Sequence, residues 1–485
     1  MKDPFENSRF ESAFLLIWAL CAFLRIPFHE LWRDEWGVWL IASVADSPSD
    51  MTAVLKYGGH PWLWPGLVYA VSRVSSSVTA MQVLHAFIAL AAVALLIFKS
   101  PFSRLQKILL SLGYLPFFEY CIVSRTYGLG MLFIFLACAL YCQIERLSVC
   151  LALVLGLLAH CSIYGAMISL ALTAAALLRR MQRHSAHRSE YLLFLGVYAA
   201  LLVVSLLIIH PPVDAGFHPE WFGKAAAGSI AAALSQMTLG LMPLQVAGTN
   251  LWSESWRNGG WGAAYPMAAL AYMAVLTAAL WSRKDVLLFF WSANLALFCF
   301  SLFKYFGYPR HAGHYFLVLV AAAWLIGVAG SGSSWRRWAN LVWIFLISAQ
   351  AAVGLYVSWR DIVLPFSGAP EATRYIVNNN LTFYPLAAYP SHPASAVAGY
   401  LGKSIYYLSY QRFGTNVIWN DQQRALTPPE LNRDLRNYAC KEDQKVLFIT
   451  NQGSEIETAG MQLLHQTSSA MVADEQFFLY LVSCS

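Results

Sequence analysis

Long apolar stretches separated by short polar turns dominate this chain. Of its 485 residues, 58% are hydrophobic and only 12% are charged, whereas an ordinary soluble domain carries about 25% charged residues. A transmembrane helix needs about 20 mostly apolar residues, and enclosed helices can be shorter. About 11 spans are therefore predicted, at 11–28, 80–98, 106–122, 126–143, 147–160, 161–178, 191–209, 262–281, 285–303, 314–331 and 338–358. The pattern predicts an α-helical polytopic membrane protein.

Basic residues in alternate turns predict the orientation of the spans. If the N-terminus is cytoplasmic, the cytoplasmic turns contain Lys99, Arg104, Lys107, Arg146, Arg179, Arg180, Arg183, Arg188, Arg283, Lys284, Arg336 and Arg337. This agrees with the excess of Lys and Arg on the cytoplasmic side of membrane proteins, and it accounts for the net charge of +6 without a nucleic-acid partner.

Two long external loops follow from this orientation. Counting 224–243 as a span would move Arg283 and Lys284 to the outside, so 210–261 is predicted as an external loop with an amphipathic or re-entrant helix. The other loop, 29–79, is expected to contain one or two interfacial helices, with its tryptophans at the depth of the lipid headgroups.

The composition becomes polar after about residue 360. Short β-like runs at 385–389, 446–450 and 477–482 predict a small extracytoplasmic α/β domain over 360–485, which follows a membrane domain over 1–359. Cys440 and Cys484 both fall in this polar part, and the other cysteines lie in apolar segments. In an oxidising compartment these two are candidates for a disulfide.

An acidic pair, Asp34-Glu35, follows the first span directly. Carboxylates beside a bilayer carry a desolvation cost, so they need a function or a partner. A carboxylate at this position could accept a proton from a hydroxyl group, as general base catalysis requires. The alternative is a solvated interfacial turn in which the pair binds Arg33.

Basic residues also occur on the predicted external face, where the orientation rule does not explain them. Arg125 lies between two short spans, and Lys304 and Arg310 flank a later span with His311 and His314. The planar fork of donors in arginine suits phosphate or carboxylate. The alternatives are structural: Arg125 pairs with Glu119, and Lys304 and Arg310 extend toward the interface. Zinc binding by the two histidines lacks a third ligand.

His60 lies in a Gly-Gly-His-Pro segment of the first external loop. The two glycines permit unusual backbone angles or the close approach of a ligand. An ordinary entry into a helix explains the segment equally well, because proline is favoured in the first turn of a helix.

Four segments together resemble the GT-C fold glycosyltransferases, in the branch of the protein O-mannosyltransferases and the lipid A aminoarabinose transferase. They are LWRDEW, GGHPWLW, SRTYGLGMLF and YPRHAGHYFLVLV, and their order and sidedness carry the resemblance. The last segment departs from the family pattern, because His311 replaces the aromatic residue expected after Arg310. A clear second acidic residue of the kind that some members use is also not identified.

The resemblance implies inverting transfer of a sugar from a polyprenyl-phosphate-linked donor to an acceptor hydroxyl. Asp34 would be the base, and Glu35 would orient it or cap its helix. Arg125, with Arg310 or Lys304, would bind the donor phosphate. Four further residues of these segments are expected to contact the substrates, namely His60, Tyr127, His311 and His314.

The same resemblance implies the partners of the protein. The acceptor would be a glycan, a lipid or a protein, and membrane lipids would surround the spans. The scheme requires no cofactor, and a divalent metal stays open. The compactness of the single chain favours a multi-pass protein of a bacterial inner membrane, with its active site facing the periplasm, although an endoplasmic reticulum enzyme would share this topology.

Three other classes of function stay open at this point. A transporter or lipid flippase would often show an inverted repeat and charges near mid-membrane, whereas the charges here gather at one face. A ligase would use a pyrophosphate-linked donor. A membrane scaffold would bind partners through the C-terminal domain without catalysis.

Overall fold

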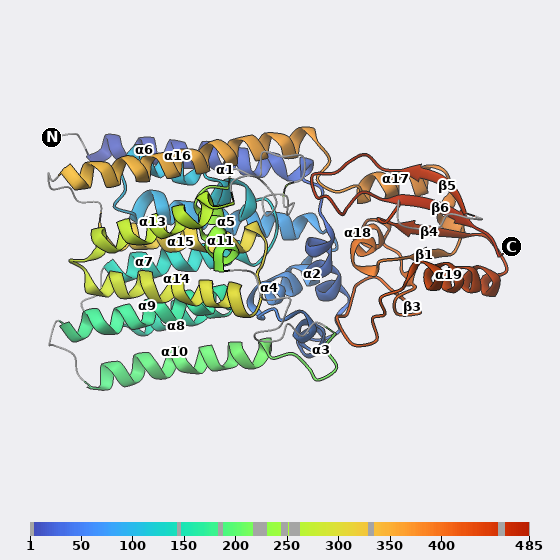
Figure 1. The fold of residues 1–485 in the computed structure, drawn as a ribbon, viewed down its shortest axis with the longest axis horizontal. Helices are drawn as coiled ribbons and strands as arrows, with labels where there is room; N and C mark the ends of the chain where they lie inside the picture. Colours follow the sequence, from blue (N-terminus) through green and yellow to red (C-terminus); the bar gives the residue numbers. More distant parts are fainter. Residues whose placement is uncertain are drawn as a thin grey trace.

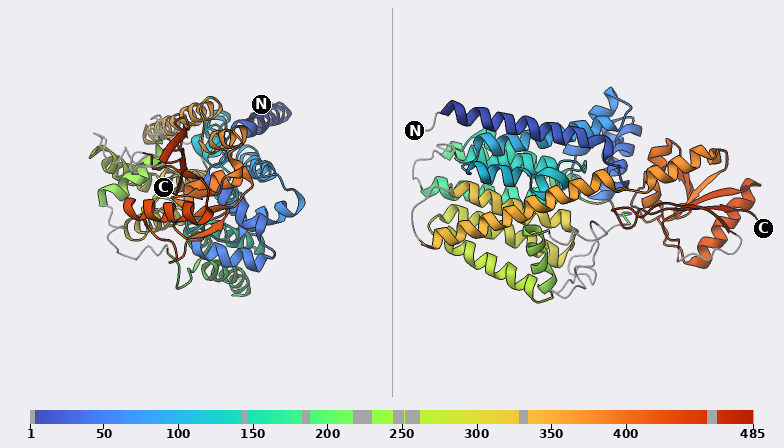
Figure 2. Two further views of the ribbon diagram at one scale, coloured as in Figure 1. Left: turned by 90° about the vertical axis from the view of Figure 1, so that its right-hand side faces the viewer. Right: turned by 90° about the horizontal axis from the view of Figure 1, so that it is seen from above.

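The computed structural model shows a long helical bundle with a smaller sheet domain at one end (Figures 1 and 2). It describes residues 4–142, 147–182, 188–216, 230–243, 251, 262–327, 334–453 and 461–484. The N-terminus and the sheet domain lie at opposite ends of the bundle (Figure 1). The predicted class, a polytopic helical membrane protein with a small C-terminal sheet domain, is confirmed.

Helices coincide with all the predicted spans. They are α1 (Pro4–Arg25), α5 (Thr79–Lys99), α6 (Arg104–Ser111) with η3 (Tyr114–Glu119), α7 (Tyr127–Cys142), α8 (Val149–Ala159), α9 (Ile163–Gln182), α10 (Arg188–Ile209), α13 (Ala264–Leu280), α14 (Lys284–Phe303), α15 (Pro309–Ile326) and α16 (Ser334–Val363). Within the described ranges, 6 helices are long and apolar enough to cross a membrane. The count of about 11 crossings and their direction stay predictions, and Arg146 and Arg183 lie outside the described residues.

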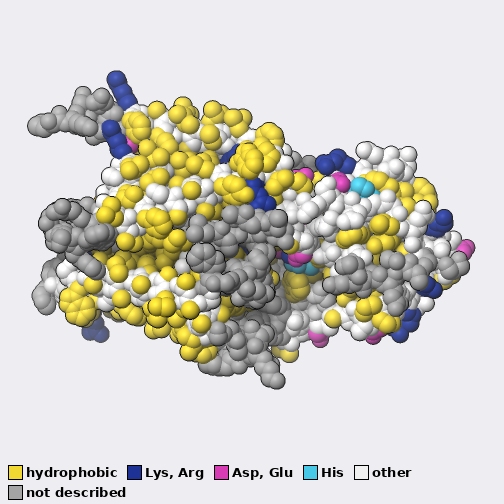
Figure 3. Space-filling view, turned by 45° about the horizontal axis from the view of Figure 1, so that its top comes forward, with side chains coloured by type: hydrophobic (Ala, Val, Ile, Leu, Met, Phe, Trp, Pro, Cys, Tyr) yellow, Lys and Arg dark blue, Asp and Glu magenta, His cyan; other side chains and the backbone are white. Residues whose placement is uncertain are grey.

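Apolar side chains make up much of the bundle surface on the face that Figure 3 shows. Helix α10 is the clearest case, because Leu192 is 62% exposed and Leu207 is 66% exposed. Such a surface is unstable in water and stable against hydrocarbon, so it agrees with a membrane-embedded bundle.

The predicted span 106–122 is not one continuous helix. Helix α6 ends at Ser111, and a turn of π-helix, η3, follows after Gly113. Pro116 lacks an amide donor, which weakens a regular helix here. Helix α16 packs closely against the break, because a Cβ added to Gly354 would lie 2.3 Å from the carbonyl oxygen of Leu112.

The described part of the loop 210–261 contains α11 (Ile230–Leu241). With 12 residues, this helix is about 18 Å long, too short to cross a membrane. It also runs across the direction of the long helices rather than along it (Figure 1). Residues 217–229, 244–250 and 252–261 of this loop lie outside the described residues.

Three helices rather than one or two occupy the first external loop. They are α2 (Arg33–Val44), α3 (Pro48–Leu55) and α4 (Leu63–Val74), preceded by η1 (Ile26–Phe28) and joined by η2 (Lys56–Gly58). Trp36, Trp39 and Trp64 of this loop are at most 6% exposed, and their depth in the membrane stays a prediction. They are buried because the sheet domain covers these helices and shares one apolar cluster with them.

The C-terminal domain is built on a six-stranded mixed sheet of order β3-β2-β1-β4-β6-β5. Its elements are α17 (Ala369–Asn378), η5 (Leu381–Phe383), β1 (Leu386–Ala388), α18 (Ser391–Leu401), β2 (Ile405–Tyr407), β3 (Arg412–Gly414), α19 (Pro428–Glu442), β4 (Val446–Thr450), β5 (Met461–Gln466) and β6 (Phe478–Val482). Strand β1 is parallel to β2 and β4, and the other pairs are antiparallel. Helix α16 extends to Val363, so the bundle continues directly into this domain.

The alternation of side chains along the central strands explains how helices cover both faces of the sheet. On β4, Leu447 and Ile449 join the cluster that contains α17, α18 and the external helices. Phe448, between them, joins the cluster that contains α19 on the other face. Cys440 of α19 and Cys484 after β6 form a disulfide, with their Cα atoms 4.5 Å apart.

Candidate active site

Three side chains from distant segments converge on Asp34 in the first turn of α2. Arg125 Nη1 pairs with Asp34 Oδ2, and Arg310 Nη2 lies 3.5 Å from the same oxygen. His392 Nε2 lies 3.3 Å from the other oxygen, Oδ1. Burial opposes ionisation, but Arg125, His392 and Arg310 outweigh it and hold the pKa of Asp34 well below its usual range. Asp34 is therefore a carboxylate at neutral pH.

Arg125 is positioned by its backbone between η3 and α7. Buried His85 of α5 lies between two carbonyl oxygens, with Nε2 2.8 Å from that of Arg125 and Nδ1 2.9 Å from that of Cys121. A Cβ added to Gly128 would lie 2.7 Å from His85 Nε2, so glycine permits this close approach. The guanidinium group extends from this anchored turn to Asp34.

Arg310 lies in the first turn of α15 and is 8% exposed. Its guanidinium carbon lies 4.7 Å from the ring centroid of Tyr308 and 5.2 Å from that of Trp32. The hydroxyl of Tyr120 donates to its carbonyl oxygen at 2.6 Å. Aromatic rings therefore enclose the cation and aim it at Asp34.

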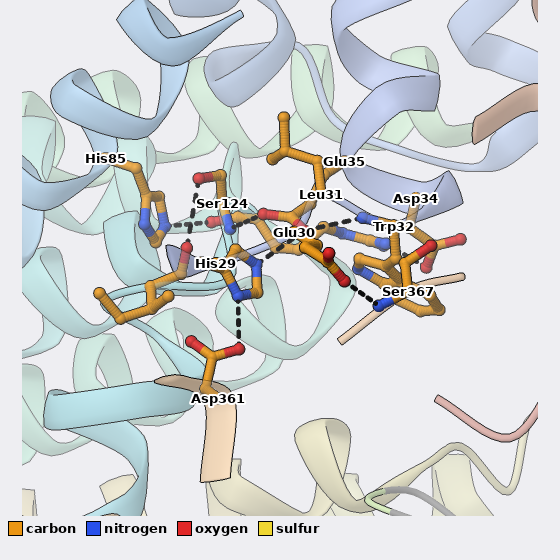
Figure 4. Close-up of polar contacts among 12 residues, drawn as sticks. His29, Glu30, Leu31, Trp32, Asp34, Glu35, His85, Ser124, Asp361 and Ser367 are labelled. Carbon is orange, nitrogen blue, oxygen red and sulfur yellow. Dashed lines mark hydrogen bonds and ion pairs between the residues drawn. The ribbon is translucent and has the colours of Figure 1, made fainter. Parts of the chain in front are cut away.

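Glu35, next to Asp34, belongs to a separate and sealed network (Figure 4). Its Oε1 accepts from the backbone N–H of Ser124 at 2.6 Å, and its Oε2 accepts from that of Trp32 at 3.3 Å. His29 Nε2 lies 3.1 Å from Glu35, and its Nδ1 lies 2.9 Å from Asp361 at the end of α16. Glu35 thus caps α2 and holds the turn before Arg125.

His29 carries the positive charge of this sealed network. Burial alone would lower the pKa of His29, but Asp361 and Glu35 outweigh it and raise the pKa to about 10. His29 is therefore an imidazolium between two carboxylates, and all three side chains are closed to solvent.

Arg33 does not bind the acidic pair. Its Nη2 lies 2.6 Å from Asp474, and its backbone N–H donates to Glu475 Oε1 at 2.9 Å. Both acidic residues belong to the sheet domain, between β5 and β6. The interfacial turn in which Asp34 and Glu35 pair with Arg33 is therefore wrong, because Arg33 joins α2 to the sheet domain.

An aromatic cluster lies next to the two arginines. The ring of Tyr164, at the start of α9, stacks on His314 at 4.7 Å and on His311 at 5.2 Å. Tyr127, in the first turn of α7, meets the same two rings edge-on at 5.6 and 5.7 Å. His311 Nδ1 also accepts from the backbone N–H of Tyr308 at 2.8 Å, so it caps α15. Among the described residues, no cluster of three or more metal-ligating side chains occurs.

Two further predicted site residues lie near this cluster without touching Asp34. His60 is exposed between η2 and α4. Lys304 follows the last turn of α14, and in the described part of the chain it is not within ion-pair distance of Asp34.

Four residues around the acidic pair and its arginines were not predicted from the sequence, namely His392, His29, Asp361 and Tyr164. His29 adjoins the acidic pair, so its position could have raised the question of a partner. His392 and Asp361 carried no such signal, because each meets the pair only through the packing of distant segments.

The chain resembles known proteins in its fold but not in its sequence. No protein-family model matches the chain, and no curated protein matches it. Among solved structures, ArnT from Cupriavidus metallidurans bound to undecaprenyl phosphate superposes with a TM-score of 0.53 at 12% identity, covering 99% of this chain and 98% of ArnT. The apo state of ArnT gives a TM-score of 0.54 at 12% identity, with 98% of each chain covered. The superposition includes both the helical bundle and the sheet domain. The chain therefore has the GT-C fold of ArnT.

Proposed function

We propose that this chain is a membrane glycosyltransferase that moves a sugar from a polyprenyl-phosphate-linked donor to an acceptor hydroxyl, with inversion. The observation that carries the proposal is the pairing of Asp34 with Arg125 and Arg310 at the end of the bundle beside the sheet domain. This site combines a proton acceptor with two cations. The likeness of fold adds support, because one of the ArnT structures contains undecaprenyl phosphate.

The two arginines suit the leaving group of this reaction. When the bond between the sugar and the phosphate breaks, one additional negative charge develops on the lipid phosphate. Arg125 and Arg310 are anchored from different helices and are nearly enclosed, so they can stabilise this charge without reorganising. We assign them to the donor phosphate, with Lys304 as a third cation at its edge.

Asp34 has the complementary role. The acceptor oxygen attacks the anomeric carbon from the face opposite the phosphate, its proton passes to Asp34, and the electron pair of the broken bond leaves with the phosphate. In the structure the arginines make Asp34 a weak base. A donor phosphate shares these arginines, which weakens their hold on Asp34 and raises its basicity when the acceptor is to be deprotonated.

The remaining predicted residues have supporting roles in this scheme. Glu35 fixes α2 and the turn before Arg125. We assign Tyr127, His311, His314 and His60 to contacts with the donor sugar, because they border the arginines. The scheme uses no divalent ion. We place the protein in a bacterial inner membrane with the site facing the periplasm, and we assign the acceptor to the glycan, lipid or protein of that compartment.

The test is release of polyprenyl phosphate from a panel of polyprenyl-phosphate sugars, with an envelope extract as the source of acceptor. We expect the Asp34→Asn variant to lose activity by about 100- to 10,000-fold, the range for a general base, while it folds normally. Asp46→Asn is the matched control, since Asp46 is exposed in the same external loop.

Each outcome is decisive for a different part of the proposal. Release by wild type and by Asp46→Asn, but not by Asp34→Asn, supports donor class and base together. Equal release by Asp34→Asn removes the base assignment. Absence of release from every donor rejects the proposed activity in favour of a pyrophosphate-dependent ligase or a transporter.

A further inference from the structure

The sheet domain contributes one side chain to the site around Asp34. His392 lies in the first turn of α18, and this helix packs directly on α2, which contains Asp34. A Cβ added to Gly399 of α18 would lie 2.4 Å from the Trp36 ring, and the hydroxyl of Tyr400 donates to the carbonyl oxygen of Leu31 at 3.2 Å. The two helices are therefore fixed against each other, and so is the distance from His392 to Asp34.

The partners of Asp34 divide between its two oxygens. Arg125 and Arg310 both bind Oδ2, whereas His392 is the side chain within ion-pair distance of Oδ1 among the described residues. The oxygen held by two cations is the weaker proton acceptor, because its charge is already compensated. An acceptor hydroxyl that gives up its proton will therefore give it to Oδ1.

His392 also marks the open side of the site. Its side chain is 30% exposed, against 11% for Arg125 and 9% for Arg310. Its ring meets Trp419 edge-on at 4.8 Å. An acceptor arriving from outside the membrane therefore reaches Oδ1 past the sheet domain, whereas the arginines lie on the bundle side.

Burial and the nearby charges together determine the protonation state of His392. The surrounding protein and Arg33 lower the pKa of His392, although Asp34 and Asp474 act in the opposite direction. At neutral pH the ring is therefore uncharged, and a neutral imidazole has one N–H donor. An ionised Asp34 can only accept a hydrogen bond. The tautomer of His392 that carries its hydrogen on Nε2 can therefore donate to Oδ1.

We propose that His392 is a positioning residue for Asp34: its Nε2–H donates to Oδ1 and holds this oxygen toward the acceptor hydroxyl. The inference rests on the proposed function and deepens it. The catalytic base is then assembled by two parts of the chain, with the cations from the helical bundle and the orienting donor from the sheet domain. The C-terminal domain is thus a component of the active site as well as a cover for the external helices.

The experiment compares His392→Ala, His392→Gln and His465→Ala in the full-length protein. Glutamine keeps a side-chain N–H donor, whereas alanine removes it. His465→Ala is the matched control, because His465 also lies in the sheet domain and also pairs with a carboxylate, Glu371, at 3.0 Å. Release of polyprenyl phosphate gives kcat and the KM for the donor, and thermal unfolding checks the fold.

We expect His392→Ala to lower kcat by about 100-fold, the typical effect of misplacing a catalytic group by about 1 Å, with the KM for the donor unchanged. His392→Gln should recover most of the rate, and His465→Ala should match wild type. Equal losses in the alanine and glutamine variants, a rise in KM alone, or full activity of His392→Ala would each overturn the positioning role. An inactive wild type would instead reject the proposed function, and this inference with it.

Discussion

Two neighbouring carboxylates, Asp34 and Glu35, lie in opposite environments. The Asp34 side chain is 15% exposed and faces two arginines and a histidine, whereas the Glu35 side chain is closed to solvent and bound by backbone amides and His29. The open group can meet a substrate, and the sealed group has every hydrogen bond satisfied within the protein. Residue type therefore does not separate the proposed catalytic carboxylate from the structural one. The two carboxylates differ in the partners that the fold brings to each of them.

The largest expected effect that tests this contrast is on the rate of transfer, and it comes from the partners of Asp34. Arg125→Ala should reduce the rate of transfer by about 100-fold, equivalent to about 3 kcal/mol in the barrier, because one preorganised cation at the leaving phosphate is lost. The unfolding temperature should change little. Turnover with a polyprenyl-phosphate sugar and thermal unfolding in detergent measure the two effects.

Arg73→Ala is a suitable control for Arg125→Ala, since Arg73, at the end of α4, donates to the backbone carbonyl oxygens of Ala42 and Ser43 in the last turn of α2, away from Asp34. If both arginine variants lost activity equally, Arg125 would have no special role at the phosphate.

A smaller effect, on stability rather than on rate, is expected on the sealed side. Asp361→Asn leaves buried His29 with one carboxylate instead of two, and breaking a buried ion pair typically costs about 3 kcal/mol. The variant should unfold at a lower temperature, while the protein that remains folded keeps its kcat. Loss of kcat without loss of stability would show that the sealed network takes part in the chemistry.

The most gradual expected effect is a dependence of stability on pH. The pKa of His29 is raised from its ordinary value of 6.5 to about 10 in the folded protein. Its contribution to stability is therefore complete below about pH 6.5 and is lost as the pH rises toward 10. Unfolding temperatures from pH 6 to 10 should fall for wild type, and the decline should be weaker for His29→Gln. Parallel curves for the two proteins would contradict the charged state of His29.

Much of the fold could be predicted from the sequence because the signals are local. An apolar run long enough to cross a bilayer predicts a helix wherever it lies, and helices occur at each predicted span. The strands at 386–388, 446–450 and 478–482 also lie in predicted β-like runs. The break at Gly113 was not predicted, although Pro116 gave a local signal for it; the close packing of α16 on that turn has no such signal.

The candidate site, too, was predicted only in part from the sequence. Arg125 and Arg310 stood out because cations on the external face contradict the orientation rule, and the structure places both beside Asp34. Lys304 gave the same signal, yet the structure does not place it there. His392 gave no signal, because a histidine in a polar domain is unremarkable until α18 packs on α2.

By itself, the sequence determined that the chain is a bundle of apolar helices with an acidic pair and unexplained cations at one end, because hydropathy and charge act on each segment independently. Only the tertiary structure decided which acid meets the cations and which is sealed around His29. It also decided that the sheet domain buries the external tryptophans and brings His392 to Asp34. These outcomes depend on contacts between segments far apart in the chain, which no local pattern encodes.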